Sequence, residues 1–349
     1  MRKLILLAGL LAIMPASTGL ASVTPPYDTA YVEPTSGSDS PSCGPATSPC
    51  ATLNQALANI TSGGNIYVLS GGTFGPIYLT TAVSIHGPPD DSLNIVWSST
   101  APGCVAQAAG TCGQPTAIYA VEIEATASDV FKFRDLIINN GQGTSGAMRV
   151  GNAANVRMSG VSLRGGTGSP PQLLLAIPNT GSQFQLLIEG GDIGYGSAAG
   201  GVLVEPQGSS SAVVDVTHTI VQNLQYGLKF NASETTATIG VEASVNNSEV
   251  LNINGSGVAV IGTGSSQARL AVSRSNLLNA NQQAVQVNGT NAVANLYSDT
   301  IFGNAIGINL ESGGVAKTLG NNDFSNVNDC AVNEAPTSCS SVLTPQGQL

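Results

Sequence analysis

The sequence predicts an all-β protein whose chain winds into a right-handed parallel β-helix, with a short capping helix at its N-terminal end. A short polar and apolar phrase recurs from Leu136 to Phe324 at about the length of one coil of such a solenoid. Each repeat also carries an alternating phrase that is typical of a strand rather than of a helix. A regular strand repeat gives the 42% of apolar residues an interior to fill.

The first phrase is a small polar residue followed by an aliphatic residue or Phe. Its copies stand roughly 23 to 32 residues apart, so loops of different length interrupt a common unit. They are Asp135-Leu136, Ser162-Leu163, Asp192-Ile193, Thr219-Ile220, Ser244-Val245, Asn276-Leu277, Thr300-Ile301 and Asp323-Phe324. We interpret their polar members as a column of hydrogen bonds between coils.

The second phrase is usually a small residue followed by apolar, any and apolar residues. Its copies are Gly201-Val202-Leu203-Val204, Gly227-Leu228-Lys229-Phe230, Gly257-Val258-Ala259-Val260, Ala284-Val285-Gln286-Val287 and Gly307-Ile308-Asn309-Leu310. Alternation with period two predicts a strand, so every unit holds at least two strands. Leucine-rich repeats have a similar period, but their helical segment and their many fixed leucines are missing here.

The first residues have the features of a secretory signal peptide. Arg2 and Lys3 precede an apolar stretch from Leu4 to Met14, and small residues follow up to Ala21. The apolar stretch is too short to span a bilayer, so we expect cleavage after Ala21. The mature chain is then expected to be secreted or periplasmic, with no membrane insertion.

The N-terminal segment predicts a loop and then a short helix. Residues 22–50 are rich in Pro, Ser, Thr and Gly, which favour loops. From Thr52 to Ile60, apolar residues fall on one helical face, and we expect this helix to cover the first coil. The predicted organisation is a signal peptide over 1–21, an N-terminal loop and capping helix over 22–64, a parallel β-helix over 65–327 and a C-terminal tail with a disulfide over 328–349.

Six cysteines fall into three close pairs, and we expect each pair to form a disulfide. The pairs are Cys43 with Cys50, Cys104 with Cys112 and Cys330 with Cys339. An even count in a secreted chain indicates disulfides, although six cysteines allow about 15 connectivities. Metal binding is the alternative, but the spacing is not that of a zinc knuckle and no His lies close.

The segment from Tyr31 to Gly87 resembles the opening of bacterial secreted right-handed parallel β-helix proteins of the pectin lyase-like class. The resemblance rests on YVEPTSGSD, PCATLNQAL, GGNIYVLSGGTF and VSIHG. It implies the fold, and the repeats extend it to about Asn326. The class includes lyases, hydrolases, glycan binders and adhesins, so the resemblance does not select one activity.

The net charge of −10 makes nucleic acid an unlikely partner, because an acidic surface repels phosphate. The same charge disfavours polyanionic glycans. We expect no cofactor; Ca²⁺ has a role only if the protein is a lyase.

The residues between and after the apolar members of the second phrase are expected to face outward and to form ladders about 4.8 Å apart. The resulting polar face is our predicted ligand-binding surface, for a neutral or weakly charged glycan or a cell-surface partner. Its residues are Glu205, Lys229, Asn231, Gln286, Asn288, Asn309 and Glu311.

Glu122 and Glu124 are the candidates for a catalytic pair. They stand two apart on a predicted strand, which places their side chains on one face at a distance suited to an inverting hydrolase. No basic or aromatic residue accompanies them in the sequence, which favours a solvated strand face. A polysaccharide lyase or glycoside hydrolase with an atypical site is therefore an alternative function, and a structural or adhesive surface protein is another.

Other polar and aromatic residues are interpreted as structural. His86 and His218 have no catalytic partner nearby in the sequence. Tyr195, Tyr226 and Tyr297 are candidates for stacking on sugars, but core or turn positions suit them better. Recurrent asparagines suggest ladders of left-handed turns; they are Asn139, Asn223, Asn279, Asn304 and Asn326.

Overall fold

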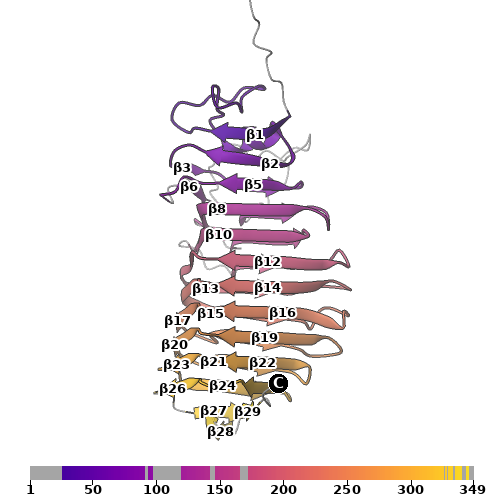
Figure 1. Ribbon diagram of the computed structural model, residues 1–349, viewed down its shortest axis with the longest axis vertical. Helices are drawn as coiled ribbons and strands as arrows, with labels where there is room; N and C mark the ends of the chain where they lie inside the picture. Colours follow the sequence, from indigo (N-terminus) through magenta and orange to yellow (C-terminus); the bar gives the residue numbers. More distant parts are fainter. Residues whose placement is uncertain are drawn as a thin grey trace, which may run out of the picture.

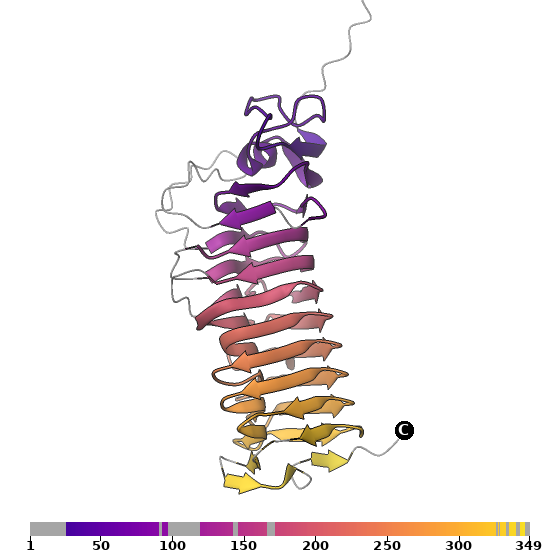
Figure 2. The ribbon, with the colours of Figure 1, turned by 90° about the vertical axis from the view of Figure 1, so that its left-hand side faces the viewer.

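The computed structural model describes residues 26–90, 93–96, 119–141, 146–165, 172–325, 327, 329–332, 335–339 and 343–345. Within them the chain forms a parallel β-helix, the architecture expected from the repeats. Successive coils stack along one axis, as the row of parallel strands shows in Figure 1 and, turned by 90°, in Figure 2. The predicted signal peptide, Cys104, Cys112 and Asn326 lie outside the described residues.

Three parallel ladders run along the solenoid, and we call them the front, second and third sheets. The front sheet faces the viewer in Figure 1 and comprises β1 (Tyr27–Val32), β2 (Ile60–Val68), β5 (Val83–His86), β8 (Val130–Asn139), β10 (Asn155–Arg164), β12 (Gln183–Glu189), β14 (Ser211–Thr217), β16 (Ile239–Asn246), β19 (Gln267–Ser273), β22 (Ala292–Tyr297), β25 (Val315–Thr318) and β29 (Leu343–Pro345).

The other two sheets share long strands that bend from one face to the next. The second sheet contains β3 (Gly72–Phe74), β6 (Leu93–Val96), the ends of β8 and β10, β13 (Asp192–Val204), β15 (Ile220–Asn231), β17 (Glu249–Ile253), β20 (Asn276–Ala280), β23 (Thr300–Phe302) and β26 (Asp323–Ser325). The third sheet contains β4 (Ile77–Leu79), β7 (Tyr119–Glu124), β9 (Gly146–Asn152), β11 (Gln172–Ala176), the ends of β13 and β15, β18 (Val258–Ile261), β21 (Gln283–Asn288), β24 (Ile306–Glu311) and β27 (Asp329–Val332). A short strand, β28 (Ala335–Thr337), is antiparallel to β27.

The second phrase lies on the third sheet in the register that the sequence alignment gives it. Its first apolar members are successive partners in the ladder: Val202, Leu228, Val258, Val285 and Ile308. These side chains are buried, so alternation along the strand identifies the inward face correctly.

The first phrase lies mainly on the second sheet, but its predicted alignment is partly wrong. Ile193 is opposite Val221 rather than Ile220, and Leu163 is opposite Ile138 rather than Leu136. Val245 belongs to the front sheet, and Val250 takes its place in the second. A small polar residue before an aliphatic one also occurs in front-sheet strands, so the phrase alone does not identify the sheet.

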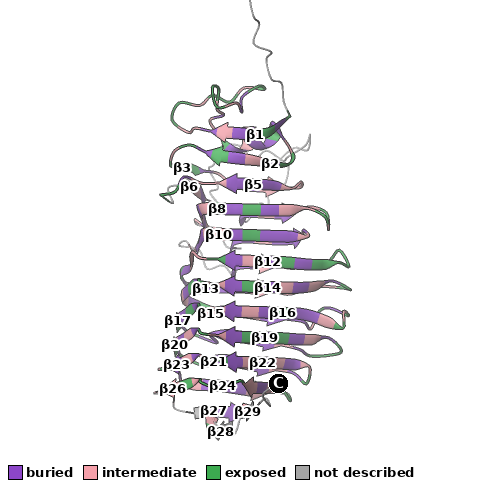
Figure 3. Ribbon diagram, in the orientation of Figure 1, coloured by how far each residue is buried: buried purple, intermediate pink, exposed green. Residues whose placement is uncertain are grey.

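The interior is filled by apolar side chains that stack from coil to coil. Under the front sheet, Val216, Val245, Val272 and Leu296 are successive partners and are almost completely buried. Figure 3 shows the resulting alternation of buried and more exposed positions along the front strands. Burial of this continuous column stabilises the solenoid, since each coil covers the apolar face of the next.

A buried polar ladder joins the coils where the front sheet turns into the second sheet. Backbone N–H groups donate to the side-chain oxygen of the next coil: Thr219 to Ser248 (3.2 Å), Ser248 to Ser275 (3.2 Å), Ser275 to Asp299 (3.0 Å) and Asp299 to Asn322 (3.0 Å). Hydrogen bonding between coils was expected, but of the predicted column only Thr219 belongs to this ladder. Five other members do share one column, as predicted, but it is the neighbouring column of the second sheet. They are Ser162, Asp192, Asn276, Thr300 and Asp323.

Asparagines occupy the turn between the second and third sheets. Asn223, Asn252 and Asn279 have positive φ values of 56°, 56° and 57°, and Asn279 donates to the Asn252 side chain (3.5 Å). The expected asparagine turn ladder is thus confirmed for Asn223 and Asn279, because Asn tolerates this left-handed backbone. Asn139 instead lies in β8, and Asn304 is buried.

The N-terminal end differs from the prediction in its boundaries. Helix α1 (Leu53–Ala58) is shorter than the predicted Thr52 to Ile60, because Ile60 already begins β2. Strand β1 (Tyr27–Val32) lies in the segment expected to be a loop, and it pairs with β2. Helix α1 packs against both strands, while its role as a cover for the first coil stays a prediction.

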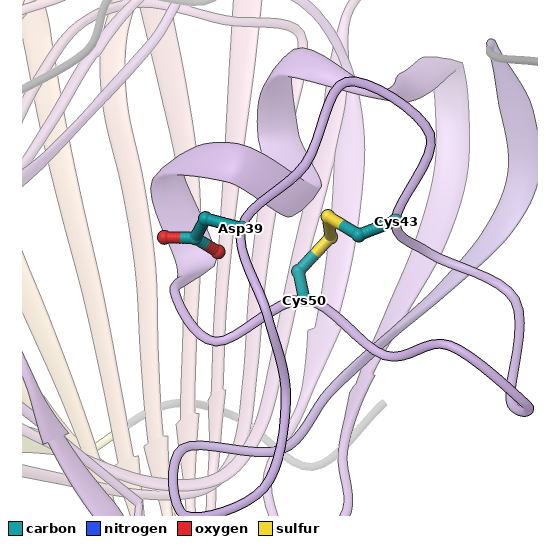
Figure 4. A group of neighbouring side chains, drawn as sticks. All are labelled: Asp39, Cys43 and Cys50. Carbon is teal, nitrogen blue, oxygen red and sulfur yellow. A yellow bond between two sulfur atoms is a disulfide. The ribbon is translucent and has the colours of Figure 1, made fainter.

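A disulfide between Cys43 and Cys50 closes the loop before the helix, as predicted. Asp39 lies beside it in Figure 4, and these three residues bring their sulfur and carboxylate atoms within 4.8 Å. Asp39 accepts hydrogen bonds from the backbone N–H groups of Ala51 (2.9 Å) and Thr52 (3.0 Å). Because the sulfurs are bonded to each other and the carboxylate orders the start of α1, we interpret this group as structural.

A second predicted disulfide joins Cys330 and Cys339 near the C-terminal end. No helix in the described ranges has the length and apolar character needed to cross a membrane.

Candidate functional site

The predicted ligand-binding residues lie together on the outer surface of the third sheet. Lys229, Gln286 and Asn309 follow one column, and Asn231, Asn288 and Glu311 follow the next, with Glu205 at the end of β13. None of the seven is fully exposed, and Asn231 and Asn309 are buried. Side chains stacked one coil apart cover one another, which the strand alternation did not predict.

Hydrogen bonds among these residues satisfy much of their polarity. Asn231 donates to Glu205 (2.5 Å), and Asn309 donates to Glu311 (2.6 Å). Gln286 donates to both oxygens of Glu311 (3.0 and 2.9 Å). A ligand on this face has to compete with these internal bonds.

Glu122 and Glu124 also lie on the third sheet, and a basic residue joins them. Arg149 on β9 is the ladder partner of Glu122, and its Nη1 donates to Glu122 (2.8 Å) and to Glu124. Tyr78 on β4 is the ladder partner of Glu122 from the opposite side. The expectation that neither a basic nor an aromatic residue accompanies the pair is therefore wrong, because both come from neighbouring coils distant in sequence.

The environment of Glu122 shifts its pKa upward. Burial raises the pKa of the Glu122 carboxyl, and Arg149 opposes the shift. Gly151 leaves room for the other carboxylate, since a Cβ there would lie 2.1 Å from Glu124 Oε1. Arg149 makes the ion pairs found in the described part of the chain. We interpret Glu122, Glu124 and Arg149 as an ion-pair cluster that links β7 to β9.

An aromatic column that the sequence analysis did not single out lies on the front sheet. Tyr31, Tyr67 and His86 are ladder partners on β1, β2 and β5, and Arg134 follows on β8. The Tyr31 and Tyr67 rings stack with centroids 5.9 Å apart, and Tyr67 and His86 with centroids 4.6 Å apart. We call Tyr31, Tyr67 and His86 the aromatic column.

A hollow of about 440 Å³ borders this column. Tyr31, Tyr67, His86 and Arg134 line it together with Leu69 and Pro88. Tyr67 is 39% exposed although it is aromatic, so its ring is available to a ligand. Figure 1 shows the strands that carry these residues stacked at the N-terminal end.

His86 is held neutral in this setting. Burial lowers the pKa of the His86 imidazole, and Arg134 lowers it further while Asp135 opposes the shift. Its Nε2 is buried and has no hydrogen-bond partner among the described residues. The ring therefore acts as an aromatic surface rather than as a cation at neutral pH.

Exposed cations continue the surface beyond the aromatic column. Lys132 and Arg134 on β8 and Arg157 on β10 point outward, and Lys132 and Arg157 are ladder partners. Arg157 also lines a second hollow of about 280 Å³ with Gln185 and Asp215. No carboxylate in the described ranges pairs with these cations. We call Lys132, Arg134 and Arg157 the basic patch.

The remaining candidates are placed in turns or at strand ends. His218 is exposed at a turn with φ 52°, in line with the expected structural role, and its Nδ1 lies 3.0 Å from the Thr217 hydroxyl. Tyr195 is an exposed turn residue under the Arg164 guanidinium, whose carbon is 5.7 Å from the ring centroid. Tyr226 is half-buried beside Gly200, and Tyr297 ends β22 on the front sheet.

The sequence did carry a signal for the aromatic column. Tyr31, Tyr67 and His86 each follow a buried apolar residue. These apolar residues are ladder partners of one another: Ala30, Ile66 and Ile85. Alignment of these early strands would have placed the three rings in one file. These strands precede Leu136, so they lie outside the recurring phrases from which the repeat was recognised.

Comparison with known proteins adds one similar structure. No protein-family model matches the sequence, and no curated protein matches it. The solved structure of the pectin methylesterase PemA from Erwinia chrysanthemi is similar with a TM-score of 0.43 and 12% sequence identity, over 71% of this chain and 78% of that chain.

Proposed function

We propose that the protein binds an acidic polysaccharide on the front sheet, with sugar rings packed against the exposed edge of the aromatic column and carboxylates on the basic patch. The observation that carries this proposal is the file of Tyr31, Tyr67 and His86 beside a hollow of about 440 Å³. Aromatic rings combine a flat apolar face with a polar edge, which suits the apolar face and the hydroxyl groups of a sugar.

The basic patch gives the surface its preference for negative charge. Lys132, Arg134 and Arg157 lie on two adjacent strands, so they present three cations within a short length of the solenoid. Charge-assisted hydrogen bonds to carboxylates are stronger than neutral ones, and Arg forms them in bidentate geometry. The net charge of −10 favours a neutral glycan, but a ligand responds to the local field of the surface it approaches.

The third-sheet residues from Glu205 to Glu311 stay a predicted second binding face. The front sheet is the stronger proposal, because its rings and cations are open whereas the amides of the third sheet are occupied by each other. A secreted or periplasmic location suits both faces, and the two disulfides agree with an oxidising compartment.

Binding is tested by calorimetry with a uronic-acid polymer and with its fully esterified, uncharged form. Tyr67→Ala should weaken binding of both polymers about tenfold, since it removes the most exposed ring of the aromatic column. Tyr297→Ala is the matched control, because Tyr297 lies in the same outward file of the front sheet and is also 39% exposed. It should leave the affinity unchanged.

The charge preference is tested in the same experiment. The acidic polymer should bind more tightly than the esterified one at low salt, and the difference should shrink as salt screens the basic patch. Arg134→Gln should reduce the difference without affecting the esterified polymer. Equal loss of affinity in Tyr67→Ala and Tyr297→Ala would contradict the proposal, and no binding of any polymer would favour a structural or adhesive role.

Catalysis by Glu122 and Glu124 is the alternative function, and polymer length after incubation measures it. The raised pKa of Glu122 suits a general acid. Shortened polymer that persists in the Glu122→Gln, Glu124→Gln double variant would exclude these residues as the catalytic pair.

A further inference from the structure

Four polar side chains form a square on the third sheet at the C-terminal end of the solenoid. Gln286 and Asn288 stand two apart on β21, and Asn309 and Glu311 stand opposite them on β24. Three amide groups and one carboxylate therefore lie within one coil of each other, about 4.8 Å apart across the strands and about 7 Å apart along them.

Two oxygens of this square have no partner. Asn309 is only 2% exposed, and both its Oδ1 and the Oδ1 of Asn288 are buried without a hydrogen bond to any described residue. A buried acceptor left unsatisfied is costly, so such groups commonly mark the position of a missing donor or ion.

The amide orientations are not interchangeable. The Nδ2 of Asn309 and the Nε2 of Gln286 both donate to Glu311, at 2.6 Å and at 2.9 and 3.0 Å. Turning either amide around would place an oxygen against the carboxylate, which repels it. The unpartnered Oδ1 of Asn309 is thus a consequence of the charge on Glu311, and it lies on the same amide group that touches this carboxylate.

The other glutamate of this face has a different environment. Glu205 accepts from Asn231 (2.5 Å), whose Oδ1 in turn accepts from the backbone N–H of Ser233 (3.1 Å). No amide oxygen is left over there among the described residues. Among the described residues of the third sheet, the unsatisfied amide oxygens therefore belong to the square around Glu311.

We propose that Asn288, Asn309 and Glu311, assisted by Gln286, bind a hard divalent cation such as Ca²⁺. Calcium takes carboxylate and amide oxygens together with water. A cation at the square would satisfy both unpartnered amide oxygens and neutralise Glu311, for which the described residues supply no cationic partner. The site is separate from the proposed glycan surface, because it lies on another sheet and at the opposite end of the molecule.

The cation would tie two neighbouring coils together, since its ligands come from both β21 and β24. With a single carboxylate the site should be weak, with a dissociation constant on the order of 10⁻⁴ to 10⁻³ M. Its expected effect is a higher unfolding temperature, because a ligand that binds only the folded state stabilises it.

The test is a calcium chloride titration of the chelator-treated protein, followed by its unfolding temperature and by terbium luminescence. Calcium should raise the unfolding temperature of the unmodified protein and compete with bound terbium. Glu311→Gln should lose both responses. Glu205→Gln is the matched control, since it removes a glutamate from the same face, and it should respond as the unmodified protein does.

Asn288→Asp provides a test in the opposite direction. It places a second carboxylate in the square next to Glu311, so calcium should bind at least tenfold more tightly. Terbium binding to Glu311→Gln is measured well below its unfolding temperature, so a loss of stability does not obscure the result. No calcium response in the unmodified protein up to 10 mM, or an equal response in Glu311→Gln, would overturn the proposal.

Discussion

The outer surface of the front sheet carries two different kinds of side-chain column at its two ends. In the C-terminal half, small polar residues bond to each other from coil to coil: Ser244 donates to Asp215 (2.5 Å), and Ser273 donates to Asn246. In the N-terminal half, Tyr67 and His86 stack on each other, and Arg134 finds no carboxylate among the described residues. The first column is satisfied internally, whereas the second is open to a ligand.

The two halves of the front sheet share one repeated backbone but differ in whether their outward side chains stabilise the fold or are open to a ligand. Both halves use the same parallel register, so the ladder itself does not decide which of them binds a ligand. Polar side chains that pair between coils stabilise the solenoid, while exposed ring edges and unpaired cations contribute less to folding and more to recognition. Changes in the C-terminal polar ladders should therefore affect stability, and changes in the aromatic column should affect binding.

The largest effect on stability is expected for Asn304→Ala. Asn304 is buried; its Nδ2 donates to the Leu277 (2.9 Å) and Phe302 (3.1 Å) carbonyls, and its Oδ1 accepts from the Ala280 N–H (2.7 Å). Its removal should lower the free energy of unfolding by about 3 kcal/mol, because several buried backbone groups lose their partner. Chemical denaturation measures this change. Asn281→Ala is the control, because Asn281 is exposed. An equal loss of unfolding free energy in both variants would contradict the idea that buried ladders stabilise the fold more than exposed ones.

An intermediate effect is expected for Asp299→Ser, which replaces the one ionisable member of the buried polar ladder. Burial raises the pKa of Asp299 to about 6 from its ordinary 3.8, against the backbone N–H groups of Ser275 and Tyr297. The folded state therefore holds this proton more tightly than the unfolded chain does. Its contribution to stability is greatest below pH 3.8 and is lost as the pH rises to about 6.

Asp299→Ser should raise the free energy of unfolding at pH 7 by about 2 kcal/mol and flatten its dependence on pH between these values. Serine already fills this position one and two coils earlier, at Ser275 and Ser248. Denaturation at a series of pH values measures the slope. A slope unchanged from the unmodified protein would show that Asp299 does not titrate as its burial implies.

The smallest effect on stability is expected for Tyr67→Ser. The ring is 39% exposed and makes its aromatic contacts with Tyr31 and His86. The free energy of unfolding should fall by no more than about 1 kcal/mol, while glycan binding should weaken about tenfold, as in Tyr67→Ala. A thermal melt and a binding isotherm on the same sample measure both. A large loss of stability would mean that the aromatic column serves the fold rather than a ligand.

Local patterns predicted the fold because each strand buries the same alternate residues on every coil. The second phrase was aligned correctly from Val202 to Ile308, since its first apolar members are successive ladder partners. The first phrase did not, and Val245 was placed in the wrong sheet for that reason. Loop lengths differ from coil to coil, so counting residues cannot correct such an error.

The candidate sites depend on contacts between coils that sequence distance conceals. Arg149 meets Glu122 and Glu124 because β7 and β9 are adjacent in the third sheet, and the pair looked unaccompanied along the chain. Tyr31 and Tyr67 stack across the helix and loop that separate them in sequence. Alternation along the strand predicted that Asn309 points outward. It did not predict that neighbouring coils bury Asn309 or that its Oδ1 has no hydrogen-bond partner among the described residues.

The sequence by itself determined the solenoid and the inward face of the third sheet, because these follow from period and from alternation within single strands. The two described disulfides follow the expected neighbour pairing, which the cysteine count alone did not select. Only the tertiary structure decided which outward side chains satisfy each other and which stay open. That outcome depends on the register of neighbouring coils, where a shift of one residue changes every partner in a column.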